Sequence, residues 1–276
     1  MTAWGEVNRV SVLRFLRKKK RGNTMSIFRR NRQPQPKMWY TPGGEYDVLA
    51  SKALEAEHTL IAGATGCGKS TFLHAIMQAL LVQNSPSEAK LILCDPKAVE
   101  LKRYARLPHV LRYETEADTI LSALNQAIGI MESRYQYMAN SDQEEWTDGA
   151  RLYVVIEELA DLLSSPLKSH IKVAIQRLTQ KGRAAGVHVI AATQQPSRKM
   201  LPAELTLNFT ARFGLACETA IESKQIVGVA GCEELPDHGV CIYKYKRNIG
   251  MYKMPFVQKS DILPLINYWT SPACMG

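Results

Sequence analysis

The chain has 276 residues, of which 46% are hydrophobic, and it carries a formal net charge of +9. Its length fits one large α/β domain with a short appendage better than two full domains. Its apolar runs all fall short of the roughly 18 residues that a membrane-spanning helix needs, so the sequence excludes a transmembrane segment. We therefore expect a globular core in the cytoplasm.

The positive charge is concentrated in the first 40 residues. They contain eleven of the 35 basic side chains and one of the 26 acidic ones. This difference predicts a boundary near residue 40, between a basic N-terminal tail or linker (1–40) and a single folded domain (41–276). Such a tail binds polyanions by releasing counterions, so double-stranded DNA and the anionic surface of a membrane are both candidate partners. A solubilising extension without a partner is the alternative.

Six cysteines are present, and no two of them are spaced as Cys-x-x-Cys. The sequence therefore indicates neither a zinc site nor a thioredoxin-like redox motif. Several of the cysteines lie in apolar, strand-like runs, where a reduced thiol packs as a small hydrophobic group. We expect a reducing compartment. The six are Cys67, Cys94, Cys217, Cys232, Cys241 and Cys274.

From residue 58 onward, strand-like and helix-like segments alternate. The strand-like segments are short apolar runs, and the helix-like ones repeat apolar residues at spacings of three and four. Continuous apolar strands separated by helices predict a mainly parallel sheet covered by helices on both faces. Ligands bind such sheets at the carboxyl ends of the strands. The predicted strands are 58–62, 90–94, 152–156, 187–192, 211–215 and 239–245, and the predicted helices are 68–83, 117–139, 166–182 and 261–268.

Residues 63–70 follow the first predicted strand and read Gly-Ala-Thr-Gly-Cys-Gly-Lys-Ser. They match the phosphate-binding pattern G-x-x-x-x-G-K-[ST] in full, between a strand and a helix as the pattern requires. The glycines let successive backbone N–H groups point at a phosphate, and the helix adds the positive end of its dipole. Lys69 would reach the β- and γ-phosphates of ATP, and the Ser70 hydroxyl would bind Mg²⁺. The predicted ATP-binding residues are Gly63, Ala64, Thr65, Gly66, Cys67, Gly68, Lys69, Ser70 and Thr71.

Polar residues also follow two of the other predicted strands. Glu157 and Glu158 come after the run 152–156, and Gln194 comes after 187–192. By position, Glu157 would hold Mg²⁺ through water, and Glu158 would act as the general base that polarises the attacking water. Gln194 offers a side chain that can sense the γ-phosphate. Taken alone, two acids after a strand are more often a solvated turn, and the phosphate-binding loop is what favours catalysis.

These segments together resemble the motor domain of the FtsK/SpoIIIE family of DNA translocases, within the FtsK–HerA class of P-loop ATPases. The resemblance extends from about residue 58 to 239, roughly two thirds of the chain. It implies an α/β fold of the RecA-like P-loop NTPase type. Its most distinctive part is Gln-Lys-Gly-Arg-Ala-Ala-Gly-Val-His (180–188) followed by Ala-Thr-Gln-Gln-Pro-Ser (192–197). The other matching segments are 63–70, Asp-Pro-Lys-Ala-Val-Glu-Leu (95–101), Leu-Pro-His (107–109), Met-Glu-Ser-Arg-Tyr (131–135) and Glu-Glu-Leu-Ala-Asp-Leu (157–162).

The resemblance implies a homo-oligomeric ring, usually a hexamer, with ATP bound between subunits. In such a ring an arginine of the neighbouring subunit neutralises charge that develops on the γ-phosphate. Arg183 is our candidate, because the corresponding arginine of the class lies in its K-G-R-x-x-G stretch, which is 181–186 here. Arg212 is the second candidate. The alternative for Arg183 is a cation that only stabilises the C-terminal end of its helix.

Three features depart from the family pattern. Where the family has the aspartate that binds Mg²⁺, this chain has Glu157, which is one methylene longer, and Mg²⁺ tolerates little change in geometry. Gln195 stands where the family has arginine, and the loop after Tyr135 is short and acidic. These departures predict weak or partner-dependent ATP hydrolysis. The residues outside the match resemble neither the membrane-spanning region nor the sequence-reading winged helix of the family, so we do not expect a sequence-guided chromosome-segregation translocase.

Three functions fit these expectations. The first is an ATP-driven motor that moves double-stranded DNA for a mobile element such as a conjugative plasmid, supported by the basic tail and by Arg198 and Lys199. The second is a protein-export or coupling ATPase of a type IV or type VII-like secretion system, in which the tail docks at a membrane surface and the acidic loop meets a basic substrate. The third is a non-hydrolysing ring component, suggested by Glu157. We expect Lys69, Glu158, Gln194 and Arg183 to be the catalytic residues, and Ser70 and Glu157 to be the metal ligands.

Overall fold

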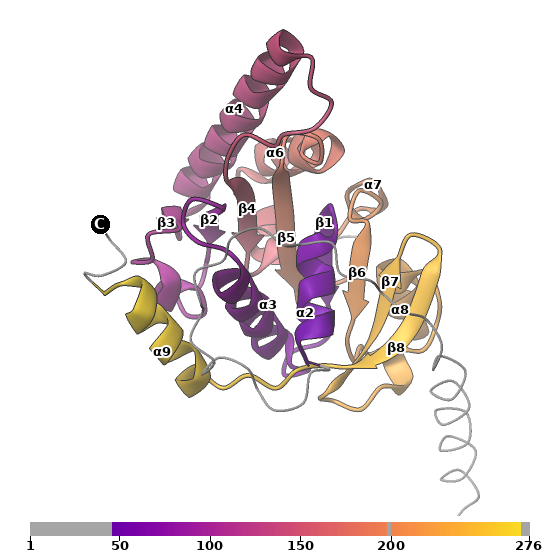
Figure 1. Cartoon of the computed structure of the whole chain (residues 1–276). Coiled ribbons are helices and arrows are strands. Elements are labelled where there is room, and N and C mark those ends of the chain that lie inside the picture. Colours follow the sequence, from indigo (N-terminus) through magenta and orange to yellow (C-terminus); the bar gives the residue numbers. More distant parts are fainter. Residues whose placement is uncertain (1–45, 198–199, 272–276) are drawn as a thin grey trace, which may run out of the picture. The chain divides into compact units, whose positions relative to one another are not determined.

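The computed structural model describes residues 46–197 and 200–271. These residues contain one eight-stranded sheet with the strand order β3-β2-β4-β5-β1-β6-β7-β8 (Figure 1). Strands β1 to β6 run parallel to one another, and β7 and β8 are added as antiparallel strands at one edge. The strands are β1 His58–Ala62, β2 Ala89–Cys94, β3 Val110–Glu114, β4 Arg151–Ile156, β5 Val187–Thr193, β6 Ala211–Gly214, β7 Val240–Tyr245 and β8 Asn248–Lys253.

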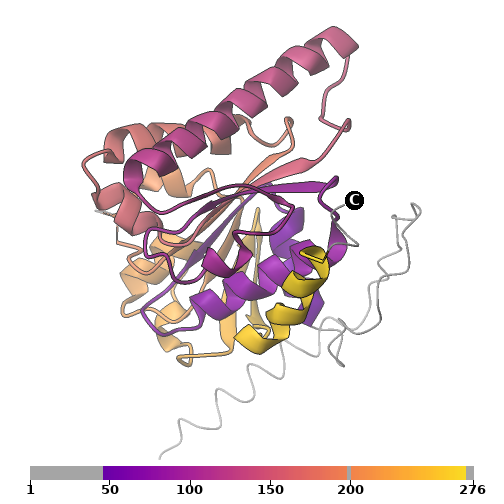
Figure 2. The ribbon, with the colours of Figure 1, turned by 90° about the vertical axis from the view of Figure 1, so that its left-hand side faces the viewer.

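Helices cover both faces of the sheet (Figure 2). On one face α3 packs against α2 and α9, and on the other α6 packs against α4 and α5. This arrangement confirms the predicted α/β fold with a mainly parallel, doubly covered sheet. Among the residues that the structure describes, no helix is both long and apolar enough to cross a lipid bilayer. The helices are α2 Tyr46–Glu55, α3 Lys69–Gln83, α4 Ala117–Ser141, α5 Leu159–Ser164, α6 Lys168–Lys181, α7 Ala203–Thr206, α8 Ala220–Val227 and α9 Lys259–Trp269, with short 3₁₀ turns η2 Lys102–Tyr104 and η3 Cys232–Glu234.

The central strands are apolar because both of their faces are covered. Every residue of β1 and β5 is buried, and β4 exposes only its first residue, Arg151. Strands in this position lack the alternation of polar and apolar residues that appears when one face meets water. Phe72 of α3 packs edge-on against Phe213 of β6, with ring centroids 4.8 Å apart. The helix that follows the phosphate-binding loop is thereby seated on the sheet.

The carboxyl ends of the parallel strands lie together along the lower side of the sheet in Figure 1, which we call the carboxyl edge. The opposite side, where these strands begin, is the amino edge. At the carboxyl edge, β1 is followed by the phosphate-binding loop, β4 by Glu157 and Glu158, and β5 by Gln194. The strand register places Ala62, the last residue of β1, beside Thr193, the last residue of β5. The predicted convergence of the motifs at this edge is therefore present in the fold.

Candidate functional site

The phosphate-binding loop is anchored to two neighbouring strands by backbone hydrogen bonds. The Gly63 N–H donates to the Thr193 carbonyl (3.3 Å) at the end of β5, and the Ala64 N–H donates to the Ala216 carbonyl (2.7 Å) just after β6. Gly68 has a φ of 94°, in the left-handed region that favours glycine, and it caps α3. The loop thus leads from β1 directly into the N-terminus of a helix, where the helix dipole favours an anion.

Two glycines of the loop are needed for different reasons. A Cβ atom at Gly63 would lie 2.8 Å from Cys67 Sγ and 2.9 Å from the Ala216 carbonyl oxygen, so no side chain fits there. Gly66 has open space around it but a φ of 80°, so its requirement is conformational. Cys67, 2% exposed, fills the inside of the turn. The motif glycines therefore reflect both close packing and backbone geometry.

Lys69 folds back over the loop. Its Nζ donates hydrogen bonds to the carbonyl oxygens of Gly63 (2.9 Å) and Ala64 (2.7 Å), and the side chain is buried. Burial lowers the pKa of the Lys69 ammonium, while the nearby carboxylates of Glu158 and Glu157 act in the opposite direction. A buried ammonium at the N-terminus of a helix attracts a phosphate, because the phosphate supplies opposite charge and strong hydrogen-bond acceptors.

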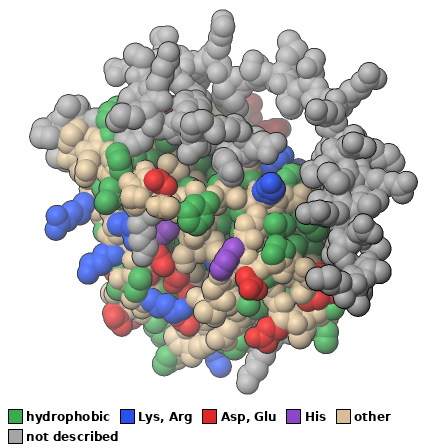
Figure 3. Space-filling model, turned by 90° about the horizontal axis from the view of Figure 1, so that it is seen from below, with side chains coloured by type: hydrophobic (Ala, Val, Ile, Leu, Met, Phe, Trp, Pro, Cys, Tyr) green, Lys and Arg blue, Asp and Glu red, His purple; other side chains and the backbone are tan. Residues whose placement is uncertain are grey.

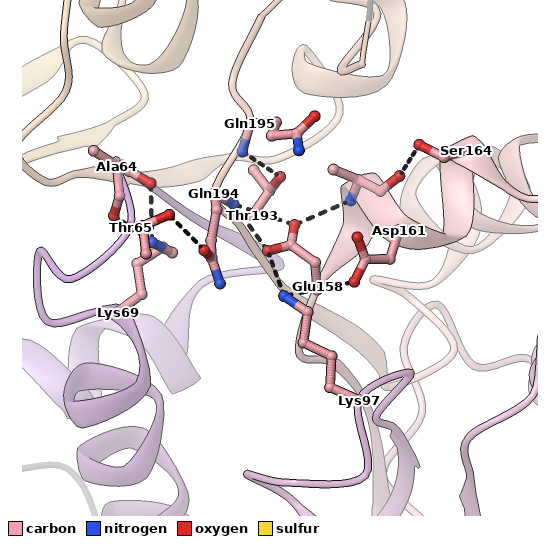
Figure 4. Close-up of polar contacts among 12 residues, drawn as sticks. Ala64, Thr65, Lys69, Lys97, Glu158, Asp161, Ser164, Thr193, Gln194 and Gln195 are labelled. Carbon is pink, nitrogen blue, oxygen red and sulfur yellow. Dashed lines mark hydrogen bonds and ion pairs between the residues drawn. The ribbon is translucent and has the colours of Figure 1, made fainter.

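Gln194 connects the phosphate-binding loop to Glu158 (Figure 4). Thr65 Oγ1 donates to Gln194 Oε1 (2.8 Å). The backbone N–H of Gln194 donates to both carboxylate oxygens of Glu158, at 3.1 Å each. Glu158 is 1% exposed and also caps α5, since it accepts a hydrogen bond from the Ala160 N–H (3.2 Å). The structure thus brings together three predicted site residues from three separate parts of the chain.

Glu157 is buried beside other acids and keeps one oxygen without a partner. It is 7% exposed, and no described residue donates a hydrogen bond to its Oε2. Burial, together with the charges of Glu158, Asp95 and Glu100, raises the pKa of Glu157 to about 7, although Lys97 acts against this rise. A cation bound here would supply the positive charge that the ionised Glu157 carboxylate lacks as a partner. It would thereby lower the pKa of Glu157 again.

These residues fit a magnesium site that the nucleotide completes. Ser70, which follows Lys69 in the first turn of α3, is half-buried, as is Thr71 next to it. In residues 46–197 and 200–271, no three His, Cys, Asp or Glu side chains form a group that could hold a metal by themselves. Mg²⁺ typically takes one or two protein ligands and completes its shell with water and phosphate oxygens. The assignment of Ser70 and Glu157 as ligands stays a prediction.

Replacing Glu157 by glutamine should stabilise the metal-free protein at neutral and higher pH. The pKa of about 7 in the folded state lies above the ordinary value of 4.5, so the folded chain holds a proton that the unfolded chain releases. This destabilisation grows as the pH rises from about 4.5 to 7 and amounts to about 3 kcal/mol at most. In thermal melts with a chelator, Glu157→Gln should melt above the wild type at about pH 8 and level with it at about pH 4.

The control for this prediction is the addition of Mg²⁺ with ATP. Binding to the folded state should stabilise the wild type and reverse the order of the two melting temperatures. If the two proteins melt alike at high pH in the chelator, Glu157 ionises normally and the cation-binding interpretation fails.

Asp95 and Lys97, for which no role was predicted from the sequence, lie at the same edge of the sheet. Asp95 is fully buried, accepts a hydrogen bond from the Leu101 N–H (2.9 Å) through Oδ2, and keeps Oδ1 without a partner among the described residues. Lys97 Nζ lies 3.9 Å from Glu158 Oε2 and 3.5 Å from Asp161 Oδ2 (Figure 4). The sequence did contain a signal for Asp95. It is the first residue after β2, just as Glu157 is the first residue after β4.

Arg183 lies at the opposite edge of the sheet from the phosphate-binding loop. It follows α6 and precedes β5, and its Nη1 is 3.4 Å from Oε1 of Glu57, which comes just before β1. The seven residues of β5 separate the two edges by about 20 Å, at ~3.3 Å per residue. Arg183 therefore cannot reach the loop of its own chain, while its side chain, 65% exposed, is accessible to a neighbour. Arg212 is held inside: burial lowers its pKa, and it donates to the Ile226 carbonyl (3.2 Å).

The sequence profile of the FtsK/SpoIIIE family matches residues 29–150 and 140–198, more than half of the chain. The chain belongs to the FtsK/SpoIIIE family. The resemblance predicted from the motifs is thereby confirmed, and the chain is an FtsK-family P-loop ATPase. The assignment of residues 63–70 as its ATP-binding loop stays a prediction.

One sequence relative and two solved structures illustrate what this chain is similar to. The DNA translocase FtsK of Staphylococcus epidermidis is 32% identical over 80% of this chain, which spans only 30% of that relative's length. The cytoplasmic domain of the type VII secretion ATPase EccC of Thermomonospora curvata is 25% identical, with a TM-score of 0.64 over 74% of this chain and 26% of that one. The pCW3 conjugation coupling protein TcpA, a monomer with ATPγS, shares the fold at 20% identity, with a TM-score of 0.67 over 74% of this chain and 62% of TcpA.

Proposed function

We propose that this chain is an ATP-driven motor that moves double-stranded DNA in the transfer or maintenance of a mobile element. The observation that carries the proposal is the connection from the phosphate-binding loop through Gln194 to Glu158. It supports ATP hydrolysis, because it joins the segment that holds phosphate to the carboxylate that can act on water. Similarity to proteins named DNA translocases supports DNA as the substrate.

The residues at the carboxyl edge would divide the work of hydrolysis. Lys69 and the N-terminus of α3 would bind the triphosphate. Mg²⁺, held by Ser70 and Glu157, would neutralise charge on the phosphate oxygens. Glu158 would orient the attacking water and accept its proton. Gln194, which is hydrogen-bonded to both the loop and Glu158, would shift Glu158 when a nucleotide binds in the loop. Each role uses a side chain that already lies at this edge.

The position of Arg183 supports a ring as the active form. Its guanidinium lies at the amino edge, far from the phosphate-binding loop of its own chain, and Glu57 is its ion-pair partner there. In a head-to-tail ring of identical subunits, each subunit presents one surface to a different surface of the next. We propose a homo-oligomeric ring, a hexamer as is usual in the family, in which Arg183 of one subunit completes the ATP site of its neighbour.

The positive charge that DNA binding needs lies outside the described residues, in the basic tail (1–40) and at Arg198 and Lys199. Within residues 46–197 and 200–271, the loop after α4 is instead exposed and acidic. Negative side chains repel the phosphate backbone, so the basic segments would have to supply the contact with DNA. The acidic side chains of that loop are Asp142, Glu144, Glu145 and Asp148.

Duplex DNA should raise the ATPase rate of the full chain at low salt, and the stimulation should disappear as salt rises. A protein that neutralises roughly six to ten phosphates loses about 10³- to 10⁵-fold in DNA affinity between about 50 and 200 mM salt. ATPase rates with and without duplex DNA, at both salt concentrations, measure this effect. A chain that begins at Met38 lacks the eleven basic residues of the tail and should lose most of the stimulation. Absence of DNA binding by the intact chain at low salt would contradict the DNA motor.

A protein-export or coupling ATPase of a type IV or type VII-like secretion system is the second candidate. The match to the secretion ATPase EccC favours it, and the exposed acidic loop after α4 would suit a basic protein substrate. Docking of the basic tail at an anionic membrane surface would belong to this function. An ATPase rate indifferent to DNA, together with co-purification in a membrane complex, would favour export over DNA translocation.

A further inference from the structure

Residues 254–258 join β8 to α9 and pass along the carboxyl edge of the sheet; we name this segment the strap. β7 is antiparallel to β6, and β8 is antiparallel to β7, so β8 ends at the same edge as the parallel strands. From there the chain continues to α9, which packs against α3. Figure 1 shows the strap in yellow below the sheet, between β8 and α9.

Met254 of the strap lies beside the phosphate-binding loop. Its N–H donates to the Gly239 carbonyl (2.9 Å), and its side chain is 6% exposed. Its Cε lies 3.4 Å from the position that a Cβ on Gly68 would occupy. Gly68 caps α3 immediately before Lys69. The strap therefore passes close to the helix terminus at which the phosphates of a nucleotide would lie.

Phe256 is exposed on the strap, two residues beyond Met254. Its side chain is 73% exposed, whereas the adjacent Val257 packs against the hydrophobic core. Two residues span at most about 7 Å, so the ring lies within reach of the part of a nucleotide that extends from the loop. Figure 3 looks onto this edge and shows hydrophobic side chains at the surface among acidic and basic ones. A partner with a flat apolar face would remove this ring from water.

We propose that Phe256 stacks on the purine base of the nucleotide that the loop binds, with Met254 beside it. This inference rests on the proposed binding of ATP at Lys69. The residues assigned so far would contact only phosphates, Mg²⁺ and the attacking water, and the strap would add a surface for the base. An aromatic ring suits that role because every base presents a π-face on which the ring can stack. The exposed ring of Phe256 would be covered by the purine base of ATP when the nucleotide is bound.

Phe256→Ala in the full chain separates contact with the base from contact with the phosphates. Calorimetric titration should show a fall in ATP affinity of about 5- to 100-fold, the usual effect of losing one stacked aromatic side chain. The affinity for inorganic tripolyphosphate, which has no base, should stay unchanged. Phe256→Tyr should keep the affinity for ATP. Leu207→Ala is the matched control, since Leu207 is 70% exposed at the amino edge before β6, and it should change neither affinity.

The other outcomes contradict either the stacking of Phe256 or the binding of ATP itself. If the wild type binds ATP and Phe256→Ala binds it equally well, the stacking inference fails and the loop assignment stands. If Phe256→Ala loses affinity for tripolyphosphate as well, the strap supports the loop and does not contact the base, so the inference again fails. If the wild type binds neither ligand, the proposed function fails together with the inference. The fluorescence of Phe256→Trp should respond to ATP and not to tripolyphosphate.

Discussion

Replacing Lys69 by alanine should abolish nucleotide binding while the fold is retained. Lys69 is 7% exposed, and its ammonium donates hydrogen bonds to the carbonyl oxygens of Gly63 and Ala64 in the loop. With ATP it would exchange these contacts for one charge-assisted hydrogen bond to each of two phosphates. Each such bond contributes about 1.5–3 kcal/mol. The expected loss in ATP affinity is therefore about 10²- to 10⁴-fold.

Equilibrium titration of ATP against the wild type and Lys69→Ala measures this loss, and thermal melting without nucleotide checks the fold. Lys172→Ala is the matched control, because it removes a lysine of α6 whose ion pair with Glu204 is part of no predicted site. It should leave ATP affinity unchanged. If Lys69→Ala binds ATP as tightly as the wild type, the loop is not a triphosphate site. Membership of the family would then not imply that this chain hydrolyses ATP.

The buried centre of the fold could be predicted from the sequence, because burial on both faces leaves a continuous apolar run. That signal located β1, β4 and β5 to within one residue of their observed ends. It failed at the edges of the sheet. β3 has mostly half-buried residues, with Arg112 and Glu114 among them, and β8 exposes alternate side chains including Ile249 and Met251. Such strands form because a neighbouring strand pairs with them, and no local apolar pattern in the sequence predicts that pairing.

The candidate site divides in the same way. The phosphate-binding loop was predictable because its glycines and lysine are adjacent in the sequence, and one turn of backbone determines their geometry. The contacts among Lys97, Glu158 and Gln194 join the segments after three different strands. Their distances depend on strand order, which the sequence pattern left open. The position of Met254 beside Gly68 depends on where α9 returns to the sheet, and no motif marks it.

Replacing Glu158 by glutamine should stop ATP turnover while nucleotide binding remains. Glutamine keeps the size of the side chain and an oxygen that can accept from the N–H groups of Gln194 and Ala160, which lie at 3.1 Å and 3.2 Å here. It cannot take a proton from the attacking water. Loss of a general base lowers kcat by about 10²- to 10⁴-fold. Phosphate release under saturating ATP, together with ATP titration, separates turnover from binding.

Asp161→Asn is the control that distinguishes catalysis from local charge. Asp161 shares Lys97 with Glu158, at 3.5 Å, but its side chain is 41% exposed and caps no helix. It should leave most of the turnover intact. Turnover that survives Glu158→Gln would show that Glu158 serves only as the cap of α5. Turnover that Glu158→Gln abolishes would instead eliminate the non-hydrolysing ring component that Glu157 suggests, because a chain without hydrolysis has no turnover to lose.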